Sequence, residues 1–230
     1  MLVPRRRRGV EILDDPATDP ALRARSLRDI VRSNVLFGGR RAVLAELSRV
    51  MESLADRASL LDVGTGLGDI PCRARERARR EGKTIVAFGV DEAASLARAC
   101  AGVLDGGVCA DVRRLPFADG SVDVVTCSQL LHHFPDDEIA RVICELDRVA
   151  RVTVVICDLR RSWLAACAFW LASWPLGFHR ITRHDGFVSV LRGFTADELS
   201  RHVLGALGQR AVVRRHLGFR ISATWSKKLV

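Results

Sequence analysis

The feature that most constrains this chain is a series of five short, nearly continuous apolar runs separated by stretches with helical periodicity. The runs cover residues 60–63, 85–90, 108–110, 122–127 and 152–157. Strands of this kind are typical of parallel sheets covered on both faces. The stretches between them predict helices over 69–81, 93–101 and 136–149. Strands that alternate with helices predict a doubly wound α/β fold.

The beginning of the chain predicts two further helices. Asp19-Pro20 combines a side-chain acceptor at the N-cap with a proline at the first helical position, so we expect a helix over about 20–34. Gly38-Gly39 should end it. Apolar residues at helical spacing then predict a second helix over roughly 41–55.

The end of the chain predicts a cap and a sheet edge. An apolar stretch over 163–178 leads into an expected loop through His184-Asp185-Gly186. Thr195 and Glu198 form a capping box that starts a helix. Two strand-like runs follow, which favour an antiparallel edge pair, over 211–217 and 219–225. We therefore expect a Rossmann-like sheet of seven strands, mostly parallel with an antiparallel edge, plus N-terminal helices and a helical cap.

Charge is distributed unevenly along the chain. The net charge is +9, with an acidic middle between basic ends. This pattern allows a nucleic-acid substrate, leaves a peripheral membrane contact open, and also fits a solvated basic surface. We favour the solvated surface and expect no nucleic-acid partner. The oligomeric state stays open.

Cysteine usage and apolar run lengths limit the location and the chemistry. There are 7 cysteines, with no C-x-x-C pair and no His/Cys cluster, so we expect neither a metal nor a disulfide. The stretch over 163–178 is shorter than the about 20 residues of a membrane span. No apolar region follows the arginine run over residues 5–8, so we expect no signal peptide and a cytoplasmic protein.

A glycine-rich segment follows the first predicted strand. It reads LDVGTGLGD over 61–69 and opens a predicted helix. Glycines let the backbone turn tightly and approach a ligand at the carboxyl end of a strand. The spacing G-x-G-x-G differs from the G-x-G-x-x-G of dinucleotide folds, which disfavours a nicotinamide-dependent oxidoreductase. Without its context, the segment would be no more than a tight turn.

Carboxylates at the ends of the next strands supply that context. Asp91 ends the second strand, where it can accept both hydroxyls of a ribose. Asp111 follows the third strand, where it can accept from an adenine amino group. Ligands of open α/β sheets bind at these carboxyl ends. The structural alternatives are a helix N-cap for Asp91 and a loop acid for Asp111.

Taken together, these motifs resemble those of class I S-adenosylmethionine-dependent methyltransferases. The matching segments are LDVGTGLGD, GVD, ADVRRLPFADGSVDVVTCSQLLHHF and RGFTADEL, and the resemblance covers about residues 40–225. It implies S-adenosylmethionine as the cofactor. It also implies cofactor contacts at Asp62, Gly64, Thr65, Gly66, Gly68, Asp91, Glu92, Asp111, Val112, Ser128 and Gln129.

The same resemblance suggests how the chain is divided. We expect an N-terminal helical segment over 1–40, a cofactor-binding core over 41–159, an apolar cap over 160–194, and a C-terminal helix with edge strands over 195–230. The opening segment from Val10 to Gly39 is similar to that of bacterial methyltransferases found beside type III polyketide synthases. That similarity suggests a polyketide or phenolic-lipid acceptor.

Two histidines after the fourth strand are the candidate catalytic bases. His132 and His133 stand where an acceptor would approach the cofactor, and a base is needed when the acceptor must lose a proton. The alternative is that one of them packs or caps the following loop. His184, beside Asp185, is a second candidate for the substrate site.

The apolar stretch over 163–178 indicates the substrate class. On a helical wheel Trp163, Trp170 and Trp174 fall within about 20° of one direction. We expect the opposite, alanine-rich side to pack on the domain and the tryptophans to line a substrate cavity. The alternatives are that the tryptophans fill the core between the cap and the sheet, or that they touch a lipid surface. Each arrangement favours an apolar or aromatic acceptor.

The sequence therefore favours a methyltransferase that acts on an oxygen or a carbon of an apolar or aromatic small molecule. One alternative is an RNA or DNA methyltransferase, which the basic ends allow although no Asn-Pro-Pro-Tyr-type element is present. Another is a non-catalytic partner protein that binds S-adenosylmethionine. The sequence does not identify the methyl acceptor.

Overall fold

The computed structural model describes residues 3–7, 9–15 and 17–227, and gives only the backbone of Pro20 and Ala24. Arg8, the last residue of the arginine run, and the three C-terminal residues of the expected edge region lie outside this description. Seven strands form one sheet in the order β3-β2-β1-β4-β5-β7-β6. Their bounds are Arg57–Val63, Thr84–Asp91, Gly106–Cys109, Val122–Ser128, Ala150–Leu159, Val212–His216 and Arg220–Ser226 for β1 to β7.

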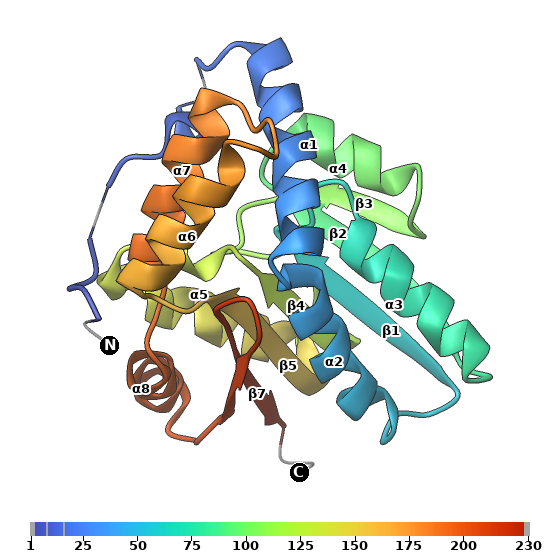
Figure 1. The fold of residues 1–230 in the computed structure, drawn as a ribbon. Coiled ribbons are helices and arrows are strands. Elements are labelled where there is room, and N and C mark those ends of the chain that lie inside the picture. The colour runs from blue at the N-terminus through green and yellow to red at the C-terminus, as the bar shows by residue number, and fades with distance from the viewer. Residues whose placement is uncertain (1–2, 8, 16, 228–230) are drawn as a thin grey trace.

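Pairing within the sheet is parallel from β3 to β5. The pairs β5–β7 and β7–β6 are antiparallel, because the chain returns to the far edge through a hairpin. The mostly parallel seven-stranded sheet with an antiparallel edge is therefore confirmed. Since β1, β2, β4 and β5 run in one direction, their carboxyl ends meet on one side of the molecule (Figure 1).

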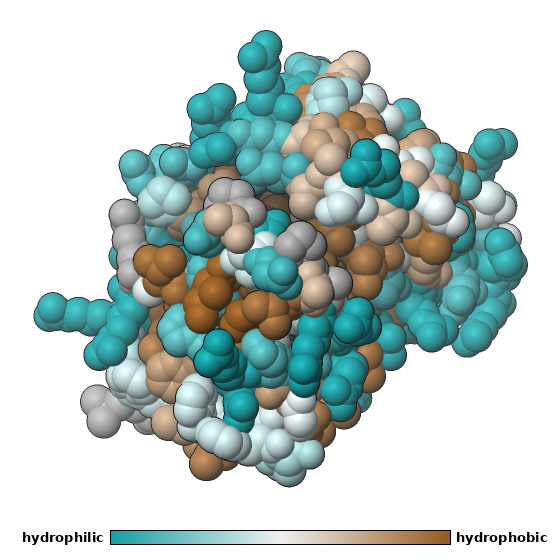
Figure 2. Space-filling model, turned by 90° about the horizontal axis from the view of Figure 1, so that it is seen from above, coloured by the Kyte–Doolittle hydropathy of each residue, from teal (hydrophilic) through white to brown (hydrophobic). Residues whose placement is uncertain are grey.

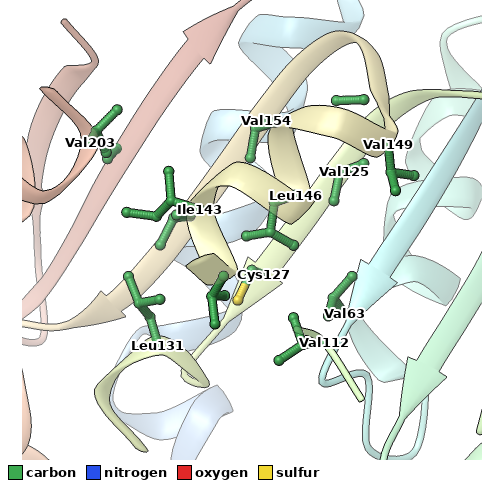
Figure 3. Close-up of a cluster of buried hydrophobic side chains, with 14 of the residues drawn as sticks. Val63, Val112, Val125, Cys127, Leu131, Ile143, Leu146, Val149, Val154 and Val203 are labelled. Atoms are coloured by element: carbon green, nitrogen blue, oxygen red, sulfur yellow. The ribbon is translucent and has the colours of Figure 1, made fainter. Parts of the chain in front are cut away.

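Helices cover both faces of the sheet. One face carries α2 (Gly39–Met51), α3 (Asp69–Arg80) and α4 (Ala94–Ala101), and the other carries α5 (Asp136–Val149) and α8 (Ala196–Leu207). Two apolar cores result. The core under α5 and α8 contains Val63, Val125, Cys127, Leu146 and Val154, whose side chains point toward one another (Figure 3). A second core joins α2 and α3 to β1 and β2.

A separate layer lies over the carboxyl ends of the strands. It consists of the N-terminal segment, α1 (Pro20–Leu36), α6 (Trp163–Ser173) and α7 (Arg180–Arg192) (Figure 1). Asp29 on α1 accepts hydrogen bonds from the backbone of His179 (3.0 Å) and from Thr182 Oγ1 (3.2 Å) at the start of α7. Among the described residues, no helix has both the length and the apolar character needed to cross a bilayer.

Asp185 fixes the N-terminal segment on α7. Its carboxylate accepts from the backbone N–H groups of Ile12 (2.9 Å) and Leu13 (3.0 Å). The Arg161 guanidinium holds the same segment further along, donating to the carbonyl of Pro4 (2.7 Å). Pro4, Ile12 and Leu13 thus depend on partners more than 150 positions away in the sequence.

The expected loop through His184-Asp185-Gly186 is wrong, because α7 continues through all three residues. Gly186 lies where α6 and α7 approach most closely: a Cβ there would come within 2.3 Å of the Phe169 ring. The glycine therefore serves helix packing. Most other elements match their predicted places, and the capping box of Thr195 and Glu198 is present.

Two helical glycines test this packing. Gly186→Ala should lower the free energy of unfolding by about 1–3 kcal/mol, since the Phe169 ring is held against Phe37 and Phe178 and cannot move freely. Gly205→Ala on α8 is the matched control, because no atom lies within 4 Å of an added Cβ. It should raise stability by roughly 0.5–1 kcal/mol. Denaturant titration measures both, and equal effects would contradict the packing argument.

Candidate functional site

The glycine loop joins β1 to α3 and forms one wall of a cavity. The backbone N–H groups of Gly64 (2.9 Å) and Thr65 (3.0 Å) donate to the carbonyl of Val90, so the loop is held against the end of β2. Gly66 has a φ of 57°, and a Cβ there would meet no atom within 4 Å. The loop therefore offers bare backbone to open space, which suits close approach of a ligand.

Asp91 lies beside this loop at the end of β2. One carboxylate oxygen accepts from Gly66 N–H (3.0 Å) and the other from Ala93 N–H (3.0 Å), while burial raises the pKa of the carboxyl. Asp91 and the following Glu92 both line the cavity. The carboxylate is thus held rigidly, with lone pairs left for hydroxyl donors.

Asp62 lies behind the loop rather than in the cavity. Its side chain is 2% exposed and accepts from Thr126 Oγ1 (2.7 Å). Burial raises the pKa of the carboxyl to about 7, with the hydrogen bond to Thr126 acting in the opposite direction. A positive charge brought to the loop would favour the ionised form.

Asp111 turns away from the cavity. Its carboxylate pairs with the Arg113 guanidinium at 2.8 Å, and Arg113 in turn pairs with Glu138. The hydrogen bond from Arg113 lowers the pKa of Asp111. The neighbours Ala110 and Val112 line the cavity instead.

The cavity has a volume of about 950 Å³ and extends from the glycine loop to the layer above the strands. Of the predicted site residues, those that line it are Gly64, Asp91, Glu92, Val112, Gln129, His132 and His133. The predicted residues beside or behind its wall are Asp62, Thr65, Gly66, Gly68, Asp111 and Ser128. Gln129 has a φ of 52°, which turns its amide toward Asn34 of α1 at 2.7 Å.

His132 forms a buried pair with Asp158. Its Nδ1 lies 2.6 Å from Asp158 Oδ1, and its backbone N–H donates to Asp158 Oδ2 at 3.1 Å. The imidazole is 3% exposed, and its Nε2 has no hydrogen-bond partner among the described residues, although the Glu11 carboxylate lies 4.0 Å away. Burial acts to raise the pKa of Asp158, but the charge and the hydrogen bond of His132 outweigh it and hold that pKa below its ordinary value. The pair fixes the ring with Nε2 free.

His133 has a different environment. Its Nδ1 lies 3.2 Å from Asp14, and Arg192 is 3.4 Å from the same nitrogen. Burial acts to lower the pKa of His133, but the hydrogen bond to Asp14 and the charges of Glu11 and Asp14 raise it overall. A histidine with a raised pKa stays protonated over more of the neutral pH range, so less of His133 is in the neutral form that a general base requires.

Sequence reasoning missed Asp158 and the acidic residues of the N-terminal segment. Asp158 comes at the end of the apolar run of β5, the same strand-end signal that identified Asp91. Glu11 is 5% exposed and accepts from Ser189 Oγ (2.8 Å) and Arg192 (2.9 Å). No local pattern places Glu11 beside α7, so only the fold could identify it.

Glu11, His132 and His133 bring three potential metal ligands within 4.8 Å of one another. The Arg192 guanidinium already occupies this group, because it pairs with Glu11 and lies beside His133. A divalent cation would have to displace that fixed positive charge. The arrangement therefore suits an ion-pair network better than a metal centre.

The structure reverses the expected orientation of α6. Ala165, Ala168 and Phe169 line the cavity, whereas Trp163, Trp170 and Trp174 do not. Trp163 and Trp170 pack against Phe187 of α7, with ring centroids 6.4 and 6.2 Å apart, and Trp174 is 59% exposed. The small residues face inward because α6 lies close to α7 and the strand ends. His184 also lies outside the cavity, paired with Asp185.

Comparisons with known proteins agree with this geometry. Residues 61–157 match the sequence model of the family described as "Methyltransferase domain". No curated protein matches the chain. A possible histamine N-methyltransferase from Thermotoga maritima has a similar structure, with a TM-score of 0.59 at 16% identity over 90% of this chain and 99% of that one.

Two further solved structures share the fold. Magnesium protoporphyrin IX methyltransferase from Synechocystis PCC 6803, with bound S-adenosylmethionine, has a TM-score of 0.56 at 12% identity over 95% and 89% of the two chains. A methyltransferase from Aquifex aeolicus has a TM-score of 0.55 at 16% identity, over 77% and 87%. Residues 61–157 thus match a methyltransferase domain, and the chain shares the fold of S-adenosylmethionine-dependent methyltransferases, one of which holds S-adenosylmethionine in its structure.

Proposed function

We propose that the enzyme methylates a hydroxyl oxygen of an apolar or aromatic small molecule, with His132 as the general base. The observation that carries this proposal is the buried pair of His132 and Asp158, which leaves Nε2 without a partner in a residue that lines the cavity. A buried nitrogen without a hydrogen bond lowers the stability of the protein unless a ligand group forms a hydrogen bond with it. A hydroxyl group of the acceptor would supply that partner.

The residues around the glycine loop fit the cofactor. The open backbone at Gly64 and Gly66 would accommodate its methionine part, and Asp91 would accept from its ribose hydroxyls. Ala110, Val112 and Glu92 would surround the adenine and ribose. Ser128 and Gln129 would form the floor near the sulfonium, and Asp62, Thr65 and Gly68 would support the loop from behind. When bound, the cofactor supplies a methyl group activated by its positive sulfur.

His132 would take the acceptor's proton while the new bond forms. A phenol with a pKa of about 10 and a histidine of about 6.5 differ by roughly 5 kcal/mol, so complete transfer before reaction is unfavourable. Asp158 would hold the ring in position and stabilise the imidazolium that develops. The same base could activate an aromatic carbon by ionising a neighbouring phenol, so the structure of the product distinguishes oxygen from carbon methylation.

The cavity wall supports an apolar acceptor. Its upper part is lined by aliphatic and aromatic side chains, among them Leu13, Leu27, Ile30, Phe37, Phe169 and Phe219. A polyketide or phenolic lipid belongs to this class. A nucleic-acid substrate fits less well, because this part of the cavity is apolar whereas nucleic-acid interfaces are strongly polar and positively charged.

We also propose that residues 1–40 and 160–194 act together as the cap over the core formed by 41–159, with 195–230 completing the sheet. The N-terminal segment and α7 are joined by Asp185 and by Arg192, which pairs with Glu11 and Asp14. Such a cap would exclude water from the reacting atoms and strengthen the electrostatic interactions of His132.

The outer face of α6 fits contact with an anionic lipid surface. Leu164, Leu171 and Trp174 are 56%, 69% and 59% exposed. No acidic residue occurs between Arg161 and Asp185, and Arg183 stacks on Trp174 at 3.8 Å. Hydrophobic residues gather in patches on this end of the molecule (Figure 2). Exposed apolar and aromatic side chains beside arginines are typical of helices that lie in an anionic membrane interface.

The cofactor site is tested by calorimetric titration with S-adenosylhomocysteine. Asp91→Ala should weaken binding by at least about 10-fold, because a carboxylate that accepts two ribose hydroxyls is lost. Asp111→Ala is the matched control; its carboxylate is paired with Arg113, so we expect affinity within about 3-fold of wild type. A folded wild type that does not bind would overturn the assigned cofactor site. Equal losses of affinity in both variants would indicate that Asp111 contacts the adenine.

The base is tested by turnover of a phenolic acceptor. His132→Gln should lower kcat by roughly 100- to 10,000-fold, because no side chain is left to accept the proton of the hydroxyl group. Asp158→Asn should lower kcat in the same direction. His133→Gln, the neighbouring control, should have the smaller effect because its ring is paired with Asp14. All three variants should bind S-adenosylhomocysteine as wild type does; an equal loss of kcat in both histidine variants would contradict the assignment.

The lipid contact is tested by sedimentation with vesicles. The protein should bind vesicles of phosphatidylcholine and phosphatidylglycerol in equal parts more strongly than pure phosphatidylcholine, and salt should weaken the binding. Leu171→Glu on α6 should abolish the contact, whereas Leu204→Glu, an exposed leucine of α8, should not. Binding that is unchanged in Leu171→Glu, or self-association through α6 in its place, would refute the lipid surface.

A further inference from the structure

Arg220 is a buried cation without an anionic partner. It begins β7, is 5% exposed and lines the cavity. Within the described part of the chain, its Nε has no hydrogen-bond partner, and Nη1 donates only a long bond, 3.3 Å, to the carbonyl of Gly218. Burial lowers the pKa of Arg220 to about 10. Leaving a buried charge unpaired is costly, which indicates that something else completes the site.

Arg161 shows how the same chain treats a buried arginine with a structural role. It is 4% exposed, and its guanidinium donates to the carbonyls of Pro4 (2.7 Å) and Gly193 (2.6 Å) and pairs with Glu198 at 2.5 Å. Every nitrogen of Arg161 therefore has a partner within the protein. Arg220 differs because its remaining donors have none among the described residues.

The nearest carboxylate is already committed. Asp158 raises the pKa of Arg220 through its charge, but its two oxygens accept from His132 Nδ1, His132 N–H and the N–H of Leu159. Asp158 therefore forms hydrogen bonds with His132 and none with Arg220. An anion that completes Arg220 has to come from a bound molecule.

Two donors lie close together beside the start of α2. A Cβ added to Gly39 would lie 2.9 Å from Nε2 of Gln129, 3.0 Å from Oδ1 of Asn34 and 3.3 Å from Nε of Arg220, so these side chains pack closely against Gly39. Gln129 uses one of its amide hydrogens on Asn34 and has a second available. Gln129 and Arg220 both line the cavity, and the N-terminus of the 13-residue helix α2 adds a favourable potential for an anion beside them.

We propose that Arg220, Gln129 and the N-terminus of α2 form a subsite for a carboxylate. Sheet order puts the subsite on the acceptor side, since Arg220 is paired with Leu159 of β5 whereas the glycine loop and Asp91 belong to β1 and β2. The acceptor is accordingly an apolar or aromatic acid, held by its carboxylate at Arg220 while its hydroxyl faces His132. This extension rests on the proposed methyltransferase function. The methionine end of the cofactor carries the same chemical group and is the other source of such a carboxylate.

Two matched pairs of probes separate these sources. 6-Pentylsalicylate and 3-pentylphenol differ by the carboxylate on the acceptor side, and both are titrated in the presence of S-adenosylhomocysteine. S-adenosylhomocysteine and 5′-methylthioadenosine differ by the amino-acid end of the cofactor. Wild type should bind the salicylate at least about 10-fold more tightly than the phenol, and Arg220→Met should abolish that difference. Arg220→Lys should retain part of it.

Failure of the methyltransferase assignment itself would be detected separately, in the titration of wild type and Asp91→Ala with S-adenosylhomocysteine. The outcomes for Arg220 are distinct from it. If Arg220→Met loses affinity for S-adenosylhomocysteine and not for 5′-methylthioadenosine, the carboxylate is that of the cofactor. If Arg220→Met and wild type bind all four probes alike, or if neither binds the salicylate more tightly than the phenol and S-adenosylhomocysteine affinity is unchanged, the subsite is refuted.

Thermal unfolding without ligand supplies a measurement that needs no acceptor. Arg220→Met should leave the Tm of the free protein unchanged or raise it, because an uncompensated cation is removed. Arg161→Met should lower the Tm by roughly 10 °C, because it leaves Glu198 and two carbonyls without their partner. A fall of similar size in Arg220→Met would show that Arg220 is structural and would overturn the proposal.

Discussion

Burial of the central strands on both faces is the constraint on which the rest of this structure depends. β1, β4 and β5 lie between two apolar layers, so their side chains can carry chemistry only where the strands end. The strands are parallel, and their ends therefore meet along one edge. Gly64, Asp91, Gln129 and His132 come together there although they are far apart in sequence.

The edge becomes a cavity only because distant segments cover it. The N-terminal segment supplies Glu11, Leu13 and Asp14, and it is held by Asp185 and Arg192 of α7. The segment held by these contacts lies beside His132, since the Glu11 carboxylate is 4.0 Å from Nε2 of its imidazole. The acids of this segment also act on the neighbouring histidine, because Glu11 and Asp14 raise the pKa of His133.

Buried charges distinguish structural residues from functional ones in this chain. Arg161 has every donor satisfied by the protein, and Asp158 has both oxygens engaged. His132 Nε2 and Arg220 Nε are left without partners, and both residues line the same cavity. Polar groups that a protein buries without satisfying them are expected where a ligand binds, because the cost is recovered on binding.

The sequence by itself determined the doubly wound sheet, the glycine loop and Asp91, because these depend on local periodicity and on the rule that parallel strands present their ends together. Tertiary structure alone decided which face of α6 meets the cavity, that α7 runs through Gly186, and that Asp158 and Glu11 flank His132. The sequence of an amphipathic or uniformly apolar helix does not determine which other element each of its faces packs against. The orientation of α6 follows from the close approach of α7 at Gly186 and of Phe37 at the end of α1, both of which pack against Phe169.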